Sequence, residues 1–314
     1  MPVTVVKNLP AIEKLAQENI FVMDTIRAES QDIRPLNILV VNLMPTKEIT
    51  ETQLLRALSN TPLQLDVTFL HTASRTAKHV AESHLESFYR TFEEIKTKYF
   101  DGMIITGAPV ELMDFEEVDY WQELSDIMNW SNSHVYSNLY ICWGAQAAMY
   151  YHFGIHKQLL SSKLFGVFEN EMYEDHPMLM RGMNEIFYMP HSRHTTVDMD
   201  EIQEHDELQV LAGSKETGAA IVRSLDNRHI FIFGHAEYDW NTLKLEYERD
   251  KALGLDIELP KNYYPDDDST KRPIVRWKST ATILYTNWLN YYVYQETPFI
   301  ANQIEKMKRI YVHR

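Results

Sequence analysis

The sequence predicts an α/β fold built on a mostly parallel β-sheet with helices on both faces. Three predicted strands, 36–43, 65–70 and 102–106, alternate with segments of helical periodicity over the first half of the chain, and the first of them is a continuous apolar run rich in β-branched residues. Continuous apolar runs are typical of strands that are buried on both faces. Strands that alternate with helices form right-handed βαβ units, and such sheets bind ligands at the carboxyl ends of their strands.

The elements of the first half follow from apolar runs and turn signals. Residues 1–35 are polar and mixed, and we expect a partly helical N-terminal arm there. Strands are predicted at 36–43, 65–70, 102–106 and 139–141, and helices at 50–59, 81–99 and 121–130. The turn at 107–109 closes the third strand.

The second half shows paired strands instead. Segments 219–223 and 229–233 flank a turn, which predicts a β-hairpin. The segment 254–273 carries three consecutive aspartates and several prolines, so we expect an exposed loop. Residues 280–296 form a predicted helix whose aromatic-rich side is expected in the core or at a dimer contact. That side carries Leu284, Trp288, Leu289 and Tyr292. The predicted divisions are an arm at 1–35, one domain at 36–298 and a tail at 299–314.

Composition narrows the class of protein. Of the 314 residues, 45% are hydrophobic, which is enough for a proper core. The formal net charge of −15 disfavours a general nucleic-acid partner, although a local cationic cluster could still bind a small anion. A single cysteine indicates a reducing compartment, and no apolar segment has the length of a membrane span. We therefore expect a cytoplasmic protein with no membrane association, no metal and no cofactor.

The single cysteine, Cys142, lies where a nucleophile would be expected. A short apolar run leads to it, and an Ala-rich helical segment begins directly after it. A helix N-terminus stabilises a thiolate, and its backbone N–H groups can hold an oxyanion. A lone cysteine is more often a small core residue, so the functional interpretation requires a base nearby.

His235 and Glu237 can supply that base and the group that orients it. They follow the predicted strand 229–233 and are two residues apart, so both side chains lie on one face in extended structure. The carboxylate can then accept from one imidazole nitrogen while the other nitrogen faces the thiol. The three residues together favour nucleophilic catalysis over a structural role.

Motifs around these residues resemble those of class I glutamine amidotransferases. Residues 142–146 are similar to their Cys-x-Gly-x-Gln elbow, 235–237 to their His-x-Glu pair, and 107–109 to their oxyanion loop. The resemblance implies a class I glutamine amidotransferase-like, flavodoxin-like fold. The chain departs from that family at Tyr140, where glycine is usual, and at Ala236, where proline is favoured.

The whole chain is more similar to the homoserine O-acyltransferases of methionine biosynthesis. The segments that carry this resemblance are 42–47, 106–111, 140–146, 163–168, 189–193 and 234–238. It implies that Cys142 becomes acylated, that His235 is the general base and that Glu237 orients it. The oxyanion is expected at backbone N–H groups of Trp143 and Ala108.

The resemblance also implies substrate contacts. Lys163, Ser192 and Arg249 are expected to bind substrate, and Arg249 suits an amino-acid carboxylate because guanidinium binds it bidentately. Lys47 is expected near the acyl group. Without the resemblance, Arg249 would be a surface charge and Lys47 an exposed loop lysine.

Glu111 carries the expected acyl specificity. The resemblance implies that glycine at this position accompanies succinyl transfer and glutamate accompanies acetyl transfer. Glutamate would fill the space of a four-carbon acyl tail, and its charge would repel the succinyl carboxylate. On its own, Glu111 would be an ordinary loop residue.

The expected function is therefore homoserine O-acetyl transfer from acetyl-CoA to L-homoserine, through an acyl-thioester on Cys142. The alternatives are succinyl transfer from succinyl-CoA, a glutamine amidotransferase, and a regulatory binding scaffold without catalysis. A homodimer is expected from the family and from aromatic residues on several faces of the last helix. These residues are Trp288, Tyr291, Tyr292 and Tyr294.

Overall fold

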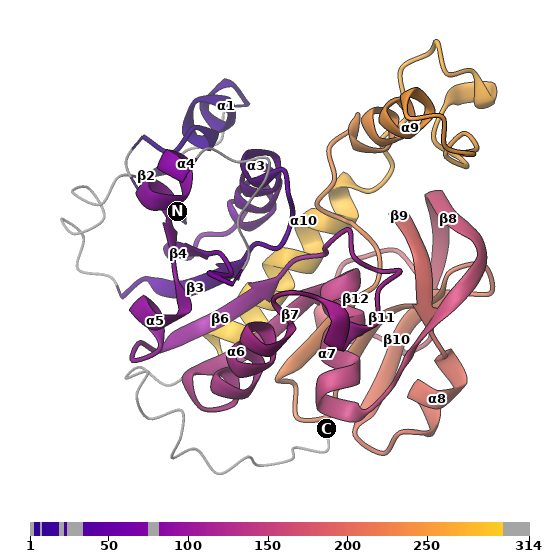
Figure 1. The fold of residues 1–314 in the computed structure, drawn as a ribbon. Helices are drawn as coiled ribbons and strands as arrows, with labels where there is room; N and C mark the ends of the chain where they lie inside the picture. Colours follow the sequence, from indigo (N-terminus) through magenta and orange to yellow (C-terminus); the bar gives the residue numbers. More distant parts are fainter. Residues whose placement is uncertain (1–2, 7, 19–21, 24–33, 75–81, 298–314) are drawn as a thin grey trace.

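One mixed β-sheet runs through the protein, as the computed structural model in Figure 1 shows. The structure describes residues 3–6, 8–18, 22–23, 34–74 and 82–297. The strand order is β2-β1-β4-β3-β6-β7-β12-β11-β10-β8-β9, with β5 beside β4. The strands are β1 Val3–Thr4, β2 Val22–Met23, β3 Leu36–Val41, β4 Leu65–Leu70, β5 Tyr89–Arg90, β6 Phe100–Ile105, β7 Val135–Ile141, β8 Lys157–Met172, β9 Ile186–Val197, β10 Leu208–Ser214, β11 Gly218–Ser224 and β12 His229–Ile232.

The sheet is parallel from β2 to β12 and antiparallel from β12 to β9. This arrangement confirms the predicted α/β class and the predicted hairpin, which is β11 paired with β12. Because β12 lies parallel to β7, with Ile232 opposite Ile141, both strands end at the same edge of the sheet. The segments after 141 and after 232 therefore emerge side by side.

Helices cover both faces of the parallel half, as predicted (Figure 1). The helices are α1 Ala11–Gln17, α3 Lys47–Leu58, α4 Glu82–Phe88, α5 Phe92–Ile95, α6 Trp121–His134, α7 Trp143–Phe153, α8 Met199–Glu204, α9 Thr242–Ala252 and α10 Lys278–Asn287. Successive residues of a strand point to opposite faces. Ile38 and Val40 of β3 accordingly pack with α3 and α10, whereas Leu39 and Val41 pack with α6 and α7.

The aromatic side of the last helix lies in the core of the chain. Leu284, Trp288 and Leu289 are fully buried, and Tyr292 is nearly so. The Trp288 indole donates to the Ser137 hydroxyl over 3.0 Å. The predicted helix is continuous to Asn287 and then becomes a π-helical segment over Trp288–Tyr294. The aromatic side of this helix is thus explained by packing within one chain.

The predicted continuous helix at 81–99 is wrong, because the helical part is interrupted by a strand and ends at Ile95. The described part divides into α4, the short strand β5 and α5. Tyr89 and Arg90 of β5 pair with Phe69 and Leu70 at the end of β4. Tyr89 is buried, and its hydroxyl donates to the carboxylate of Glu51 over 2.7 Å. This tertiary contact outweighs the helical periodicity of the segment.

The other predicted elements differ from the observed ones mainly at their ends, whereas β8, β9, β10, α8 and α9 were not predicted. Helix α3 begins three residues before the predicted start, at Lys47. In the predicted arm, β1 pairs with β4, so this part extends the sheet. The segment 254–273 holds a short 3₁₀ turn, Pro265–Asp267, and a β-bridge between Lys261 and Gly166. Tyr263 and Tyr264 are buried in a core cluster, so the prediction of an exposed loop is wrong for this part. The predicted tail at 299–314 lies outside the described residues.

Candidate active site

Cys142 occupies a sharp turn between β7 and α7. Its backbone has φ 50° and ψ −115°, a conformation that costs a residue with a side chain about 1–3 kcal/mol. The Cys142 N–H donates to Ile232 O over 2.7 Å, which ties the turn to the end of β12. The residue is 5% exposed. The strand, turn and helix predicted around the thiol are therefore present, and the backbone at the thiol is strained.

Gly144 allows α7 to begin directly against the end of β6. A Cβ atom at this position would lie 2.6 Å from Thr106 O and 2.9 Å from Ile105 O. Any other residue would therefore push the helix away from the sheet. The glycine of the Cys-x-Gly-x-Gln segment has a steric role that places the helix N-terminus at the thiol.

His235 reaches Cys142 because β12 ends beside β7. The His235 N–H donates to Pro190 O over 2.8 Å, and the ring stacks on Tyr238 with centroids 4.1 Å apart. Its Nδ1 lies 2.8 Å from Glu237 Oε1, and the ring also hydrogen-bonds the Cys142 side chain. The three predicted residues thus form a contiguous thiol–imidazole–carboxylate chain.

The electrostatics of this chain favour a protonated imidazole. Burial by itself lowers the pKa of His235, but the negative charges and hydrogen bonds of Cys142 and Glu237 raise that pKa well above its usual value. An imidazolium pairs with a thiolate, which is the nucleophilic form of cysteine. The arrangement can therefore form a covalent intermediate with an electrophilic carbonyl group.

Backbone N–H groups from two segments lie around the thiol. Trp143 is the first residue of α7, where N–H groups have no acceptor within the helix. Gly107 is so close to the thiol that a Cβ atom there would lie 3.3 Å from Cys142 Cβ and 3.5 Å from His235 Cε1. Ala108 follows Gly107 in the sequence and lines a cavity that Cys142 also lines. Trp143 and Ala108 can thus both serve an oxyanion.

A cavity of about 370 Å³ opens above Cys142. It brings together seven residues that the sequence predicts for the site: Ala108, Glu111, Cys142, Lys163, Ser192, His235 and Arg249. These residues come from segments that are up to 141 positions apart along the chain. Trp143, Glu237 and Lys47 are absent from its lining. Among the described residues, no group of three or more His, Cys, Asp or Glu side chains could hold a metal ion.

Comparison with known protein families shows to which family the chain belongs. Residues 2–299 match the family described as homoserine O-succinyltransferase. The chain belongs to this family. Curated relatives that are named homoserine O-acetyltransferase include one from Acetivibrio thermocellus, 54% identical, and one from Clostridium novyi, 56% identical. The first alignment covers 97% of this chain and 100% of the relative, and the second covers 95% and 99%.

Solved structures support the fold. A glutamine amidotransferase from Thermotoga maritima superimposes with a TM-score of 0.52 at 12% identity, over 82% of this chain and 98% of that chain. At this identity the likeness shows a shared fold alone. It agrees with the amidotransferase-like fold predicted from the sequence.

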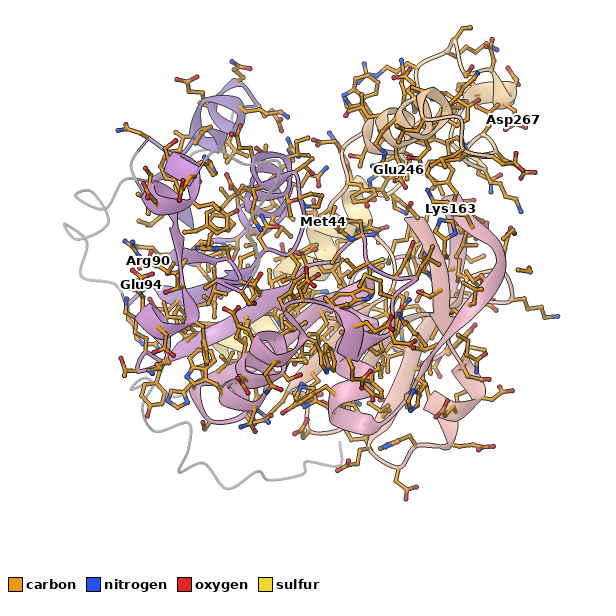
Figure 2. The ribbon with its side chains drawn as sticks, in the orientation of Figure 1. Met44, Arg90, Glu94, Lys163, Glu246 and Asp267 are labelled. Atoms are coloured by element: carbon orange, nitrogen blue, oxygen red, sulfur yellow. The ribbon has the colours of Figure 1, made fainter. Side chains whose placement is uncertain are left out.

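In this member of the homoserine O-succinyltransferase family, a polar cluster forms one wall of the cavity. Lys163 of β8 donates to Glu246 Oε1 of α9 over 2.6 Å, and the Ser192 hydroxyl donates to the same oxygen over 2.5 Å. Figure 2 shows Lys163 and Glu246 close together, between β8 and α9. Arg249 is 62% exposed in its side chain and pairs with Asp250. The cluster offers both signs of charge beside the thiol.

Glu246 is the residue of this cluster that sequence reasoning missed. It lies within a charged stretch, 244–251, that resembles an ordinary solvated helix face. Its spacing from Arg249 and Asp250 is i+3 and i+4, so the three share one face of α9. This spacing is the only sequence feature that could have indicated Glu246 as a site residue. It becomes informative only when the structure shows that residues of α9 line the cavity.

Glu111 lies at the cavity in a turn whose Met113 N–H donates to Val110 O over 3.1 Å. Burial raises the pKa of Glu111, while a contact with the His194 backbone and the charges of His194 and Lys163 partly oppose the rise. The carboxyl group is therefore partly removed from solvent, and Glu111 lines the same cavity as Cys142.

Lys47 lies behind the cavity instead of within it. It is the first residue of α3, is 7% exposed, donates through Nζ to Asn42 O, and lies 5.5 Å from the centroid of the Tyr89 ring. Lys47 is therefore not an exposed loop residue, and its expected place near the acyl group stays a prediction. Met44, from the same loop, lines the cavity instead.

Arg193 is a second residue that the sequence did not single out. It is 1% exposed, and its guanidinium donates to Thr195 O over 2.7 Å and to Thr217 O over 2.5 Å. Burial lowers the pKa of Arg193 to about 10, opposed by the charges of Cys142 and Glu111. Gln146 of α7 is hydrogen-bonded to Thr195. Arg193 thus supports the strand against which α7 is fixed.

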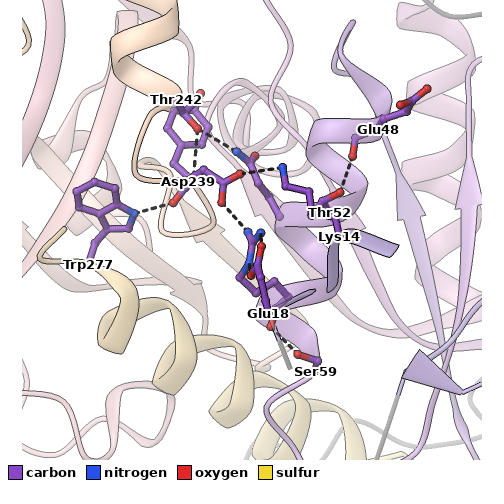
Figure 3. A network of polar contacts seen from close by, with 11 residues as sticks. Lys14, Glu18, Glu48, Thr52, Ser59, Asp239, Thr242 and Trp277 are labelled. Carbon is purple, nitrogen blue, oxygen red and sulfur yellow. Dashed lines mark hydrogen bonds and ion pairs between the residues drawn. The ribbon is translucent and has the colours of Figure 1, made fainter. Parts of the chain in front are cut away.

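A further network holds the segment that follows Glu237 (Figure 3). Arg56 of α3 pairs with Asp239 over 2.6 Å and bidentately with Glu18 over 2.5 and 2.6 Å. The Trp277 indole donates to Tyr238 O over 2.8 Å. These contacts fix the chain directly after the His235–Glu237 pair, and they connect this segment to α3 and to the end of α1.

No helix in the described residues combines the length and the apolar character needed to cross a membrane.

Proposed function

We propose that this protein is a homoserine O-acetyltransferase, which moves the acetyl group of acetyl-CoA to the hydroxyl of L-homoserine. The observation that carries the proposal is the shared cavity: it holds the Cys142–His235 pair and Glu111 together. Membership of the family supports homoserine as the acceptor. The name homoserine O-acetyltransferase, which curated relatives carry, supports acetyl-CoA as the donor.

The first half-reaction acylates Cys142. The thiolate attacks the thioester carbonyl of acetyl-CoA, and N–H groups of Trp143 and Ala108 hold the oxyanion. The His235 imidazolium gives its proton to the departing CoA sulfur. CoA leaves as a thiol, and the enzyme holds an acetyl-thioester beside a neutral imidazole.

The second half-reaction consumes that thioester. Neutral His235 takes the proton of the homoserine hydroxyl, whose oxygen attacks the acetyl carbonyl. O-acetylhomoserine leaves, and Cys142 departs as a thiolate paired again with imidazolium. Glu237 accepts a hydrogen bond from Nδ1 throughout, so Nε2 stays directed at the reacting atoms.

The polar wall suits the amino-acid end of homoserine, which carries an ammonium and a carboxylate. Glu246 accepts from Lys163 and Ser192 at one oxygen, which fixes its carboxylate as a partner for the ammonium. Arg249 is exposed beside it and can move from Asp250 to the substrate carboxylate. Lys163 and Ser192 then position Glu246 and contact the substrate.

Glu111 supports acetyl as the acyl group. Its side chain projects from a turn that borders the cavity, where a succinyl tail would place a second carboxylate. Two carboxylates in a partly buried site repel each other, and burial already raises the pKa of Glu111. Succinyl-CoA remains the second candidate donor, since the family description names succinyl transfer.

We further propose a cytoplasmic homodimer that serves methionine biosynthesis and needs no cofactor besides its acyl-CoA substrate. Support for the location is the single cysteine. Support for the dimer is Tyr294, which is 54% exposed at the end of the last helix. Light scattering over micromolar concentrations tests the dimer, and a monomer throughout would contradict it.

Product analysis tests the activity itself. The enzyme is incubated with acetyl-CoA and homoserine, and separately with glutamine, and the products are identified by mass spectrometry. O-acetylhomoserine from the wild type and none from Cys142→Ser is the expected result. Ammonia from glutamine without acyl transfer would instead support the amidotransferase alternative. Equal inactivity of both proteins with every substrate would support the binding scaffold.

A further inference from the structure

The turn that carries Glu111 is held from another strand by a lysine. Lys157, the first residue of β8, donates through Nζ to Glu111 O over 2.7 Å and also to Met113 O. One ammonium group therefore bridges two carbonyl groups of the same turn. The contact spans 46 residues of sequence, so it fastens the loop after β6 to the antiparallel half of the sheet.

Besides the lysine, the turn is held by Val110, which packs partly buried against the core, and by a contact of Glu111 with the His194 backbone. Leu112 is 68% exposed and Met113 is 38% exposed, so these side chains contribute little packing. The next firm point is Phe115, which is buried and stacks on Tyr150 with centroids 5.0 Å apart. The Lys157 ammonium also lies 4.6 Å from the centroid of the Phe115 ring. Lys157 thus links the exposed turn to its buried anchor.

The position of this turn decides where the Glu111 carboxylate lies. Because Lys157 binds the carbonyl of Glu111 itself, it fixes the backbone from which the side chain projects. Selection by size and charge requires the selecting group to stay within a fraction of an ångström of its place. Hydrogen bonds to a charged donor are stronger than neutral ones, so losing them frees the turn.

We propose that Lys157 is a positioning residue for acyl-donor selection, which holds the 110–113 turn so that Glu111 blocks the succinyl tail. This inference rests on the proposed function, in which Glu111 selects acetyl. Lys157 does not line the cavity and acts through Glu111.

The direction in which the donor preference changes distinguishes a positioning role of Lys157 from a direct electrostatic effect of its charge on the donor. If the Lys157 charge acted on the donor itself, its removal would disfavour the succinyl carboxylate and increase the preference for acetyl-CoA. If Lys157 positions Glu111, its removal lets the turn move and the preference decreases. The two explanations therefore predict opposite changes in one measurable ratio.

The test is a double-mutant cycle on donor preference. We would measure kcat/KM for acetyl-CoA and for succinyl-CoA in wild type, Lys157→Met, Glu111→Gly and the double variant. Lys157→Met keeps the stem without the ammonium, and we expect it to reduce the acetyl preference by about tenfold. Glu111→Gly should reduce it further, and the double variant should match Glu111→Gly because the lysine acts through the glutamate.

Two further variants serve as controls. Lys157→Arg retains a charged donor for the carbonyl groups and should keep most of the preference. Lys271→Met removes an exposed lysine that pairs with Asp266 and does not line the cavity, so the ratio should not change. If Lys157→Met does not fold, Lys157→Gln replaces it, and a smaller decrease is expected.

The outcomes distinguish this inference from the proposed function. An unchanged or increased acetyl preference in a folded Lys157 variant, with a decrease in Glu111→Gly, would overturn the role of Lys157 alone. An unchanged preference in Glu111→Gly would refute Glu111 as the selector and thereby the basis of this inference. Independent effects that multiply in the double variant would show that Lys157 does not act through Glu111.

Discussion

Replacement of Glu237 by glutamine tests the electrostatic chain behind Cys142. Glu237 Oε1 lies 2.8 Å from His235 Nδ1, and the Glu237 side chain is 7% exposed. The change keeps the shape of the side chain but removes one of the charges that raise the pKa of His235. We expect the rate of Cys142 acetylation to fall by about 10²–10⁴-fold, because this is the usual contribution of a correctly positioned general acid or base.

The pH dependence gives the sign of the effect. In the wild type the pKa of His235 is raised, so the reactive thiolate–imidazolium pair is lost only as pH rises through that elevated value. Without the Glu237 charge the imidazolium is less stable, and the basic limb of the acetylation profile should move to lower pH. The rate of CoA release in a single turnover, measured across pH, reports this limb directly.

The chain contains a matched control for this change. Glu51 is also fully buried and accepts from a histidine, His84, over 2.9 Å, but neither residue lines the cavity. Glu51→Gln should reduce thermal stability without moving the pH profile of acetylation. If Glu237→Gln leaves both the rate and the basic limb unchanged, Glu237 does not control the protonation of His235 and the reasoning fails.

Three further outcomes follow from the structure. Gly144→Ala should lower stability by about 1–3 kcal/mol, since its Cβ would meet Thr106 O at 2.6 Å, and an unchanged melting temperature would contradict the packing argument. Arg56→Met should lower both kcat and the free energy of unfolding. The pKa of Glu18 is lowered in the folded protein, so the difference in stability from wild type should shrink as pH falls through that pKa. A difference that stays constant with pH would show that the ion pair contributes nothing. Glu246→Gln should raise the KM for homoserine by roughly tenfold and leave acetylation of Cys142 intact, whereas the exposed neighbour Glu248→Gln should change neither. Equal effects of these two glutamine variants would refute an ammonium site at Glu246.

Local patterns were sufficient for the central strands of the parallel half. The strands β3, β4 and β6 are rich in apolar residues, and each was found within two residues of its observed ends. The short strands β1, β2 and β5 were not predicted, and β7 begins four residues before its predicted start. The elbow at Cys142 was predictable because a strand, a turn and a helix follow one another without interruption. His235 and Glu237 were predicted as a pair from the period of two in an extended segment. The two side chains do meet, but the structure places them in a turn after β12, where the Tyr238 N–H donates to His235 O, so the geometric reason was wrong.

Contacts between distant segments were beyond the sequence. Tyr89 forms a strand residue because it pairs with β4 and reaches Glu51, which periodicity over 81–99 does not reveal. Glu246 and Lys157 look like ordinary surface charges until α9 and β8 are placed beside the cavity. Their roles depend on tertiary contacts over 83 and 46 residues, which one sequence does not encode in any local pattern.

The central claim is that Cys142 becomes acetylated in preference to succinylated. One measurement tests it most directly: the enzyme is mixed with equal concentrations of acetyl-CoA and succinyl-CoA, without homoserine, and its intact mass and modified peptide are determined. The account predicts an acetyl adduct on Cys142 that disappears as O-acetylhomoserine forms when homoserine is added. A predominant succinyl adduct, or full turnover without any adduct on Cys142, would contradict it.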